Sequence, residues 1–301
     1  MKNNNLLTHR ALQERHSFCL RDIKFTDMKK LVLLASIALL FVAGAFAQAS
    51  KPPRVKLENL PDMGLRAMTN SAFTSGERVK YRLHYGMMNA GEAILTVKDS
   101  PYKFGNRDAY HLVGEGYSVG SFDWFFKVRD RYETYIDKQG LFPYRFVRNC
   151  DEGGYKIFQD YTFYPNKRAM KNHKDEAYMT PDFVQDMLSA YYYARTIDFS
   201  KAYVGQVFTV MTIVDDEIYP LKIKYMGKET VKVDAGTFNC IRFAPVVQKG
   251  RVFKKEEDLS VWITDDANHL PILVKAKILV GSVKMELVEY SGLANPVSKV
   301  N

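Results

Sequence analysis

The chain has 301 residues, of which 47% are hydrophobic and 26% charged, and its formal net charge is +9. This is the composition of a globular protein that can bury a large core. Residues 1–47 carry seven basic and three acidic side chains, so residues 48–301 keep a net charge of +5. That charge is spread along the sequence without a basic cluster, which argues against a nucleic-acid-binding protein.

A signal peptide is the first element expected in chain order. Lys29 and Lys30 precede an uncharged apolar run over residues 31–42, and a small-x-small cleavage site follows at residues 45–47. The apolar run is short for a membrane-spanning helix. The pattern therefore predicts a secretory signal peptide over residues 28–47.

The position of Met28 suggests where translation starts, because a signal peptide should begin there. We interpret residues 1–27 as a mis-assigned start or a leader extension, and we expect the processed chain to begin near Gln48. Export would place the protein in the periplasm or cell envelope of a Gram-negative bacterium, with no transmembrane segment after cleavage. Residues 48–72 are expected to form an extended N-terminal arm.

Alternation of apolar and polar residues begins after Gly76 and predicts half-buried strands. Turn sequences rich in Gly and Asn separate these strands and favour hairpins. The strands expected in this half cover residues 79–85, 92–97, 110–117, 125–136, 144–148 and 156–164, with a short piece near residue 169.

A single helix is predicted at the centre of the chain, over residues 180–196. Thr180 is a suitable N-cap, and Pro181 suits the first helical position. Apolar side chains cover so wide a stripe that the helix should be buried on more than one side. We interpret it as a plug packed against a curved sheet.

Strands resume after the helix, and the first two should form a hairpin around Asp215, Asp216 and Glu217. Strands joined by hairpins pair antiparallel, and a sheet of well over a dozen strands normally curls or closes. The predicted fold is all-β and mainly antiparallel, a curved sheet or barrel-like roll with the helix packed against it. The strands expected here cover residues 206–214, 219–226, 230–233, 238–247, 259–264, 271–279 and 282–290.

Four motifs stand out along the chain: FTSGERVKY at residues 73–81, DMLSAYYYAR at 186–195, GTFNC at 236–240 and VWITDDANHLP at 261–271. They resemble motifs of the DUF3108 family of exported bacterial envelope proteins. The resemblance implies an exported protein with a β-rich, barrel-like fold, in which residues 73–291 form a single DUF3108-like domain. It implies no established activity, so no catalytic residue follows from it. Residues 292–301 would be a frayed tail.

Two cysteines, Cys150 and Cys240, remain after removal of the leader. They could form a disulfide in an oxidising compartment, or they could be two buried free thiols. The sequence leaves both alternatives open.

The sequence lacks the common motifs for catalysis, metal binding and cofactor binding. There is no Gly-x-Ser-x-Gly elbow, no His or Cys pair at metal-ligand spacing and no phosphate-binding loop. The acidic groups at residues 215–217 and 265–268 fit hairpin turns better than calcium sites. Asp123, Asp130 and Glu133 could in principle supply the paired carboxylates of a glycosidase. Successive side chains of a strand point to opposite faces, so Glu133 should lie on the face opposite Asp130, which weakens this hypothesis.

Aromatic side chains give the candidate binding site. The sequence FDWFF at residues 122–126 is apolar on both faces, so it predicts either core packing or a hydrophobic contact. Three consecutive tyrosines at 191–193 cannot all face one core, and tyrosine suits the lining of a wet pocket. Arg195 could cap the helix or bind an anionic head group. The candidate ligand-binding residues are Trp124, Phe126, Tyr191, Tyr192 and Arg195.

These observations predict a non-enzymatic binding or carrier module for a lipid-like amphiphile. The alternative is a structural or assembly factor that binds envelope proteins or glycan. A carbohydrate-active enzyme is a third reading, which would need two facing carboxylates in a cleft.

Overall fold

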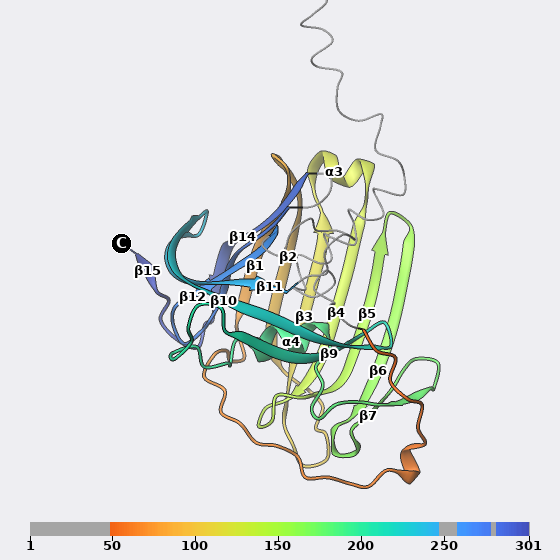
Figure 1. Cartoon of the computed structure of the whole chain (residues 1–301). Helices are drawn as coiled ribbons and strands as arrows, with labels where there is room; N and C mark the ends of the chain where they lie inside the picture. The colour runs from red at the N-terminus through yellow and green to blue at the C-terminus, as the bar shows by residue number, and fades with distance from the viewer. Residues whose placement is uncertain (1–48, 247–257, 278–280, 301) are drawn as a thin grey trace, which may run out of the picture.

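A computed structural model describes residues 49–246, 258–277 and 281–300, so the predicted leader and signal peptide lie outside the described residues. Within these ranges, fifteen strands belong to one curved sheet (Figure 1). The strands are β1 (Arg78–Tyr85), β2 (Met88–Asp99), β3 (Ala109–Ser118), β4 (Val128–Asp137), β5 (Pro143–Glu152), β6 (Tyr155–Tyr164), β7 (Ala169–Lys171), β8 (Ala177–Met179), β9 (Val207–Val214), β10 (Glu217–Val233), β11 (Gly236–Pro245), β12 (Leu259–Thr264), β13 (Pro271–Lys277), β14 (Ser282–Ser291) and β15 (Lys299–Val300). The helical elements are η1 (Leu57–Asn59), α3 (Gly120–Phe125), η2 (Pro165–Lys167) and α4 (Met187–Ala194).

The order of the strands explains why α4 lies inside the fold. The order is β8-β7-β6-β5-β4-β3-β2-β1-β14-β13-β12-β11-β10-β9, with β15 beside β11. β8 and β9 follow one another in the sequence, yet they are the two outer edges of the sheet. The segment that joins them must therefore cross from one edge to the other. Figure 1 shows α4 in the hollow of the sheet, where it contacts β3, β4 and β9.

The tip of the β9–β10 hairpin closes the curved sheet on the side of β5 to β7. The side chain of Gln159 donates to Asp215 at 2.8 Å, and that of Asn172 donates to Asp216 at 3.1 Å. Asp215 and Asp216 have left-handed φ angles of 51° and 63°, as a tight hairpin turn requires. The prediction of a turn at this acidic sequence is confirmed.

The core lies on the inner face of the sheet, as the period-two pattern predicted. In β1, the alternating residues Val79, Tyr81 and Leu83 are at most 5% exposed. Their basic neighbours lie on the outer face, because successive side chains in a strand point to opposite sides. The all-β, mainly antiparallel fold with one central helix is therefore confirmed.

The central helix is shorter than the sequence predicted. α4 spans Met187–Ala194, and its N-cap is Asp186, so the prediction of a helix over 180–196 capped by Thr180 is wrong at its start. Phe183 has a left-handed φ of 51°, and Gln185 forms a parallel β-bridge with Thr212. A residue in the left-handed region and a residue paired to a strand cannot belong to an α-helix.

A second helix replaces the start of a predicted strand. A strand was expected over residues 125–136, but Gly120–Phe125 form α3 and β4 begins at Val128. The chain leaves β3 through Gly120, whose φ of 58° suits glycine. This turn places α3 at one end of the sheet (Figure 1), with Trp124 82% and Phe125 53% exposed.

The two cysteines lie on different strands, Cys150 on β5 and Cys240 on β11. Both are buried free thiols, so the two cysteines do not form a disulfide in this structure. Burial raises the pKa of each thiol to about 12. Both thiols are therefore protonated at neutral pH in this state.

Candidate functional site

Asp186 fixes the N-terminus of α4. Its side chain accepts hydrogen bonds from the N–H groups of Leu188 and Ser189 at 2.8 and 2.9 Å, and its own N–H donates to the Ser189 hydroxyl at 2.9 Å. This is a capping box. Asp186 also lies 2.7 Å from the hydroxyl of Thr134 on β4. Burial raises the pKa of Asp186 to about 6, although these hydrogen bonds act to lower it.

Arg195 fixes the C-terminal end of the same helix. It donates to both carboxylate oxygens of Glu77 at 2.6 and 2.8 Å, and to the carbonyls of Ala72 and Asn268, both at 2.9 Å. The side chains of Arg195 and Glu77 are 2% and 0% exposed. This bidentate pair neutralises the guanidinium charge inside the core. Arg195 therefore cross-links the helix to the start of β1.

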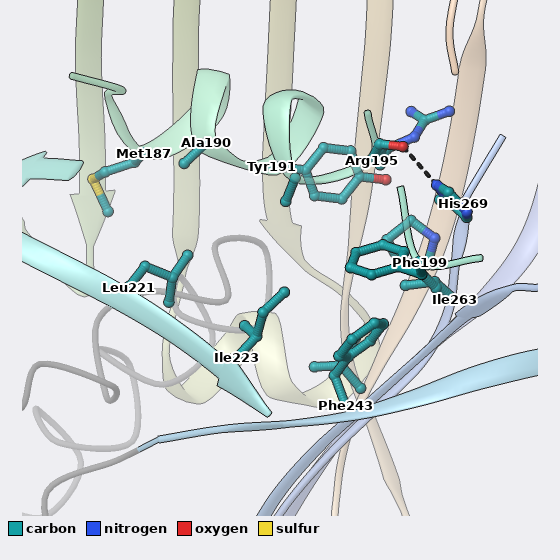
Figure 2. Close-up of a pocket in the computed structure, with 13 residues that line it drawn as sticks. Met187, Ala190, Tyr191, Arg195, Phe199, Leu221, Ile223, Phe243, Ile263 and His269 are labelled. Atoms are coloured by element: carbon teal, nitrogen blue, oxygen red, sulfur yellow. Dashed lines mark hydrogen bonds between the residues drawn. The ribbon is translucent and has the colours of Figure 1, made fainter. Parts of the chain in front are cut away.

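A cleft separates α4 from the strands of the C-terminal half, and we call it the α4 pocket. Met187, Ala190 and Tyr191 project toward it from the helix, opposite Leu221, Ile223 and Phe243 on β10 and β11 (Figure 2). The cavity measures about 60 Å³. The remaining lining residues are Ala194, Arg195, Phe199, Val261, Ile263, His269 and Pro271.

The polar groups that border the α4 pocket bond to other parts of the protein. The hydroxyls of Tyr191 and Tyr81 are 2.9 Å apart, and Tyr81 donates to the carbonyl of Pro271 at 3.1 Å. Since Tyr81 uses its proton there, Tyr191 is the donor to Tyr81. Nδ1 of His269 donates to the Arg195 carbonyl at 2.7 Å (Figure 2), and burial lowers the pKa of His269. The pocket therefore offers a ligand mainly apolar contacts.

The five residues predicted from the sequence do not form one site. Tyr191 and Arg195 line the α4 pocket. Tyr192 is 0% exposed and packs against Phe73 with ring centroids 4.9 Å apart, on a different side of the helix. Trp124 lies on α3 at the exposed end of the sheet, and Phe126 follows that helix and covers Gly153.

Sequence reasoning missed most of the pocket lining. Leu221 and Ile223 follow the alternation of β10, and Val261 and Ile263 lie in a strand that is buried on both faces. These patterns identify core strands but do not show which part of the core leaves a space. No sequence pattern marks His269 as part of the lining, and its contact with the end of α4 is seen only in the structure.

Asp130 and Glu133, two of the three carboxylates considered for a glycosidase site, lie on opposite faces of β4. On β4, Asp130 is buried on the inner face, while Glu133 lies on the outer face and bonds to His111 at 2.7 Å. Asp123 forms an ion pair with Arg129 at 2.7 Å at the α3 end. The predicted opposite placement of Asp130 and Glu133 is confirmed.

The fold and the pocket define a class of protein: a curved, antiparallel β-sheet that encloses a short helix beside an apolar cleft. The sequence model of one family matches residues 80–288 and is described as "Protein of unknown function (DUF3108)". The chain belongs to the DUF3108 family. A comparison with curated proteins found no significant match.

Two solved structures are among those similar to this chain. A β-barrel-like protein of the DUF1849 family from Brucella abortus is 13% identical, with 71% of this chain and 96% of that chain covered and a TM-score of 0.48. A DUF1089 family protein from Pseudomonas aeruginosa is 10% identical, with 60% and 87% covered and a TM-score of 0.33. In the described part of this chain, no helix has the length and apolar character to span a membrane.

Proposed function

We propose that this protein is a non-enzymatic carrier of the cell envelope that binds the alkyl chain of an amphiphile in the α4 pocket. The observation that supports this function is the pocket itself, an apolar cavity of about 60 Å³ between α4 and the strands β10 to β13. Small-molecule sites typically have a mainly apolar lining, as this pocket does. The predicted signal peptide is consistent with a role outside the cytoplasm.

The shape of the pocket favours a slim ligand. The cavity measures only about 60 Å³, so a single alkyl chain fits it better than a bulky ring system. Each methylene group that enters gains about 0.8 kcal/mol of transfer free energy. The dissociation constant should therefore fall by up to about fourfold for each added methylene until the cleft is full.

The head group of the ligand should contribute little to affinity. Glu77 neutralises the charge of Arg195, and Tyr191 and His269 use their protons in bonds within the protein. A charged head group would therefore meet no unpaired opposite charge among the described residues of the lining. Fatty acids and fatty alcohols of equal chain length should bind within about threefold of one another.

Fluorescence titration with a dansyl-labelled fatty acid, displaced by unlabelled fatty acids of increasing length, tests the proposal. Ile223→Trp places bulk inside the cleft at a half-buried position and should weaken binding at least tenfold. Val207→Trp is the matched control, because Val207 lies on the partner strand of the same hairpin and is 46% exposed. It should change the affinity by less than about twofold.

Two outcomes would refute the carrier function. One is an affinity that does not depend on the length of the alkyl chain. The other is an equal effect of Ile223→Trp and Val207→Trp, which would place binding outside the α4 pocket.

The alternative function, assembly through contact with another envelope protein, is supported by the α3 end of the sheet. Trp124 and Phe125 are 82% and 53% exposed, and their ring centroids are 4.7 Å apart. An exposed aromatic pair of this kind is more typical of a contact surface than of free surface. Crosslinking in intact cells should then capture one specific protein in the wild type and lose it in Trp124→Ala. Unchanged crosslinks would contradict this alternative.

A further inference from the structure

Three side chains with metal-binding atoms lie together on the inner face of β4 and β5. Asp130 and Cys150 are directly opposite one another in the paired strands, and Glu152 is two residues further along β5 on the same face. One ligand atom from each residue lies within 4.8 Å of the other two. The side chains of Asp130, Cys150 and Glu152 are 5%, 1% and 6% exposed.

An unsatisfied carboxylate oxygen within this group points independently to a missing partner. Oδ1 of Asp130 has no hydrogen-bond partner in the described part of the chain, although the side chain is 95% buried. Buried polar atoms in native proteins are nearly always bonded, and an absent ion is one explanation of an exception. Asp130 also lines a small second cavity of about 30 Å³ beside Gly116 and Phe122, which offers space next to the carboxylate.

The charges of the surrounding side chains also favour a cation. Two carboxyl groups and a thiol are buried side by side on this face. Arg148 is the basic side chain on this face, and it also faces Asp215 at 3.3 Å. If all three ligands were ionised, a divalent cation together with Arg148 would neutralise them.

We propose that Asp130, Cys150 and Glu152 bind a divalent transition-metal cation of the zinc type, with water as the fourth ligand. The thiolate selects zinc-like ions over magnesium and calcium, which prefer sites made of oxygen alone. A tetrahedral zinc ion has bonds of about 2.0–2.3 Å, which puts its ligand atoms roughly 3.5 Å apart. Each pair of ligand atoms would therefore have to approach by at most about 1.3 Å. The site is separate from the α4 pocket, whose lining contains none of these residues.

Cobalt is the probe for this site, because a Co²⁺ ion bound to a cysteine thiolate absorbs in the near ultraviolet. The purified protein, first stripped with a chelator, is titrated with Co²⁺ and then with Zn²⁺ as competitor. The thiolate absorption should appear with one equivalent of cobalt, and zinc should abolish it. Cys150→Ser should remove the absorption, whereas Cys240→Ser, which changes the other buried thiol, should keep it.

Asp130→Asn provides a second test that leaves the thiol in place. It should weaken zinc binding at least tenfold, as measured by competition with a chromogenic chelator, with an unchanged circular dichroism spectrum. The proposal is overturned if the wild type shows no thiolate absorption, or if the absorption survives Cys150→Ser. Zinc affinity that is equal in Asp130→Asn and wild type overturns it as well, even if Cys150→Ser does not fold.

Discussion

At neutral pH the wild-type protein, with a carboxyl group at Asp186, should be less stable than the variant Asp186→Asn, which has an amide there. Two oxygens compete for the hydroxyl of Thr134: the Arg145 carbonyl at 3.0 Å and the Asp186 carboxylate at 2.7 Å. A hydroxyl has one proton, so both contacts are hydrogen bonds only when Asp186 is protonated and donates to Thr134. Asp186→Asn reproduces that arrangement, because its amide donates to Thr134 while its oxygen still accepts from the backbone of α4.

The magnitude follows from the pKa of Asp186, which is 3.8 in an ordinary environment and about 6 in the folded protein. The folded state binds this proton more tightly than the unfolded chain. The contribution of this proton to the free energy of unfolding is therefore fully present below about pH 4 and is lost as the pH rises through about 6. The loss at neutral pH is about 3 kcal/mol. Asp186→Asn does not titrate, so it should equal the wild type near pH 4 and exceed it by about 2–3 kcal/mol at pH 7.

Urea unfolding of both proteins at several pH values between 4 and 8, followed by circular dichroism, measures this difference. The matched control is Asp182→Asn, whose exposed carboxyl lies four residues earlier in the chain. It should change the free energy of unfolding by no more than about 0.5 kcal/mol at any pH. An Asp186→Asn variant that is less stable than the wild type at pH 7 would refute the reasoning, since it would show that the ionised cap is preferred.

Three further predictions test other contacts. Arg195→Met should lower the free energy of unfolding, measured in urea, by about 3–5 kcal/mol, because it leaves Glu77 buried without a counter-ion. Adding Glu77→Gln to this variant should recover part of that loss. Strictly additive losses of the two substitutions would contradict the pairing. Gly91→Ala should destabilise the protein by at least about 1 kcal/mol, because its Cβ would lie 2.7 Å from the Tyr117 carbonyl oxygen; an unchanged Tm would contradict this close approach. Trp124→Ala should change stability by less than about 0.5 kcal/mol, since the side chain is 82% exposed, and the affinity for fatty acids should not change; a weaker affinity would contradict the location of the pocket.

The strands could be predicted because their signal is local. The alternation that buries Val79 and Tyr81 and exposes the basic residues between them is visible in a few residues of sequence. The hairpin tip at Asp215 and Asp216 was equally predictable, since these residues tolerate the left-handed conformation that the turn needs. The number of strands and their connection by hairpins then sufficed to predict one curved antiparallel sheet.

The start of α4 could not be predicted from local preference alone. Thr180 and Pro181 form a good start signal, but the pairing of Gln185 with Thr212 holds the intervening residues in an extended path. That pairing depends on the tertiary arrangement of the β9 edge. A local signal for the true start was nevertheless present, since Asp186 and Ser189 have the spacing of a capping box.

The candidate site was predictable only on the side of the helix. Tyr191 and Arg195 stood out as unusual residues of a buried helix, and both line the pocket. The facing wall comes from strands whose place opposite α4 depends on the pairing of β1 with β14. The partner of Arg195 is Glu77, which is 118 residues away in the sequence, and no local pattern connects them. Long-range pairing therefore decided both the lining of the pocket and the role of the arginine.

Native mass spectrometry of the processed protein, purified from its own envelope without detergent, tests the proposed carrier function most directly. We expect a bound mass that denaturation releases as an amphiphile with an alkyl chain, and we expect Ile223→Trp to lose it while Val207→Trp retains it. A bare protein mass in the wild type, or the same ligand retained in Ile223→Trp, would contradict the assignment of the α4 pocket as a site for amphiphiles.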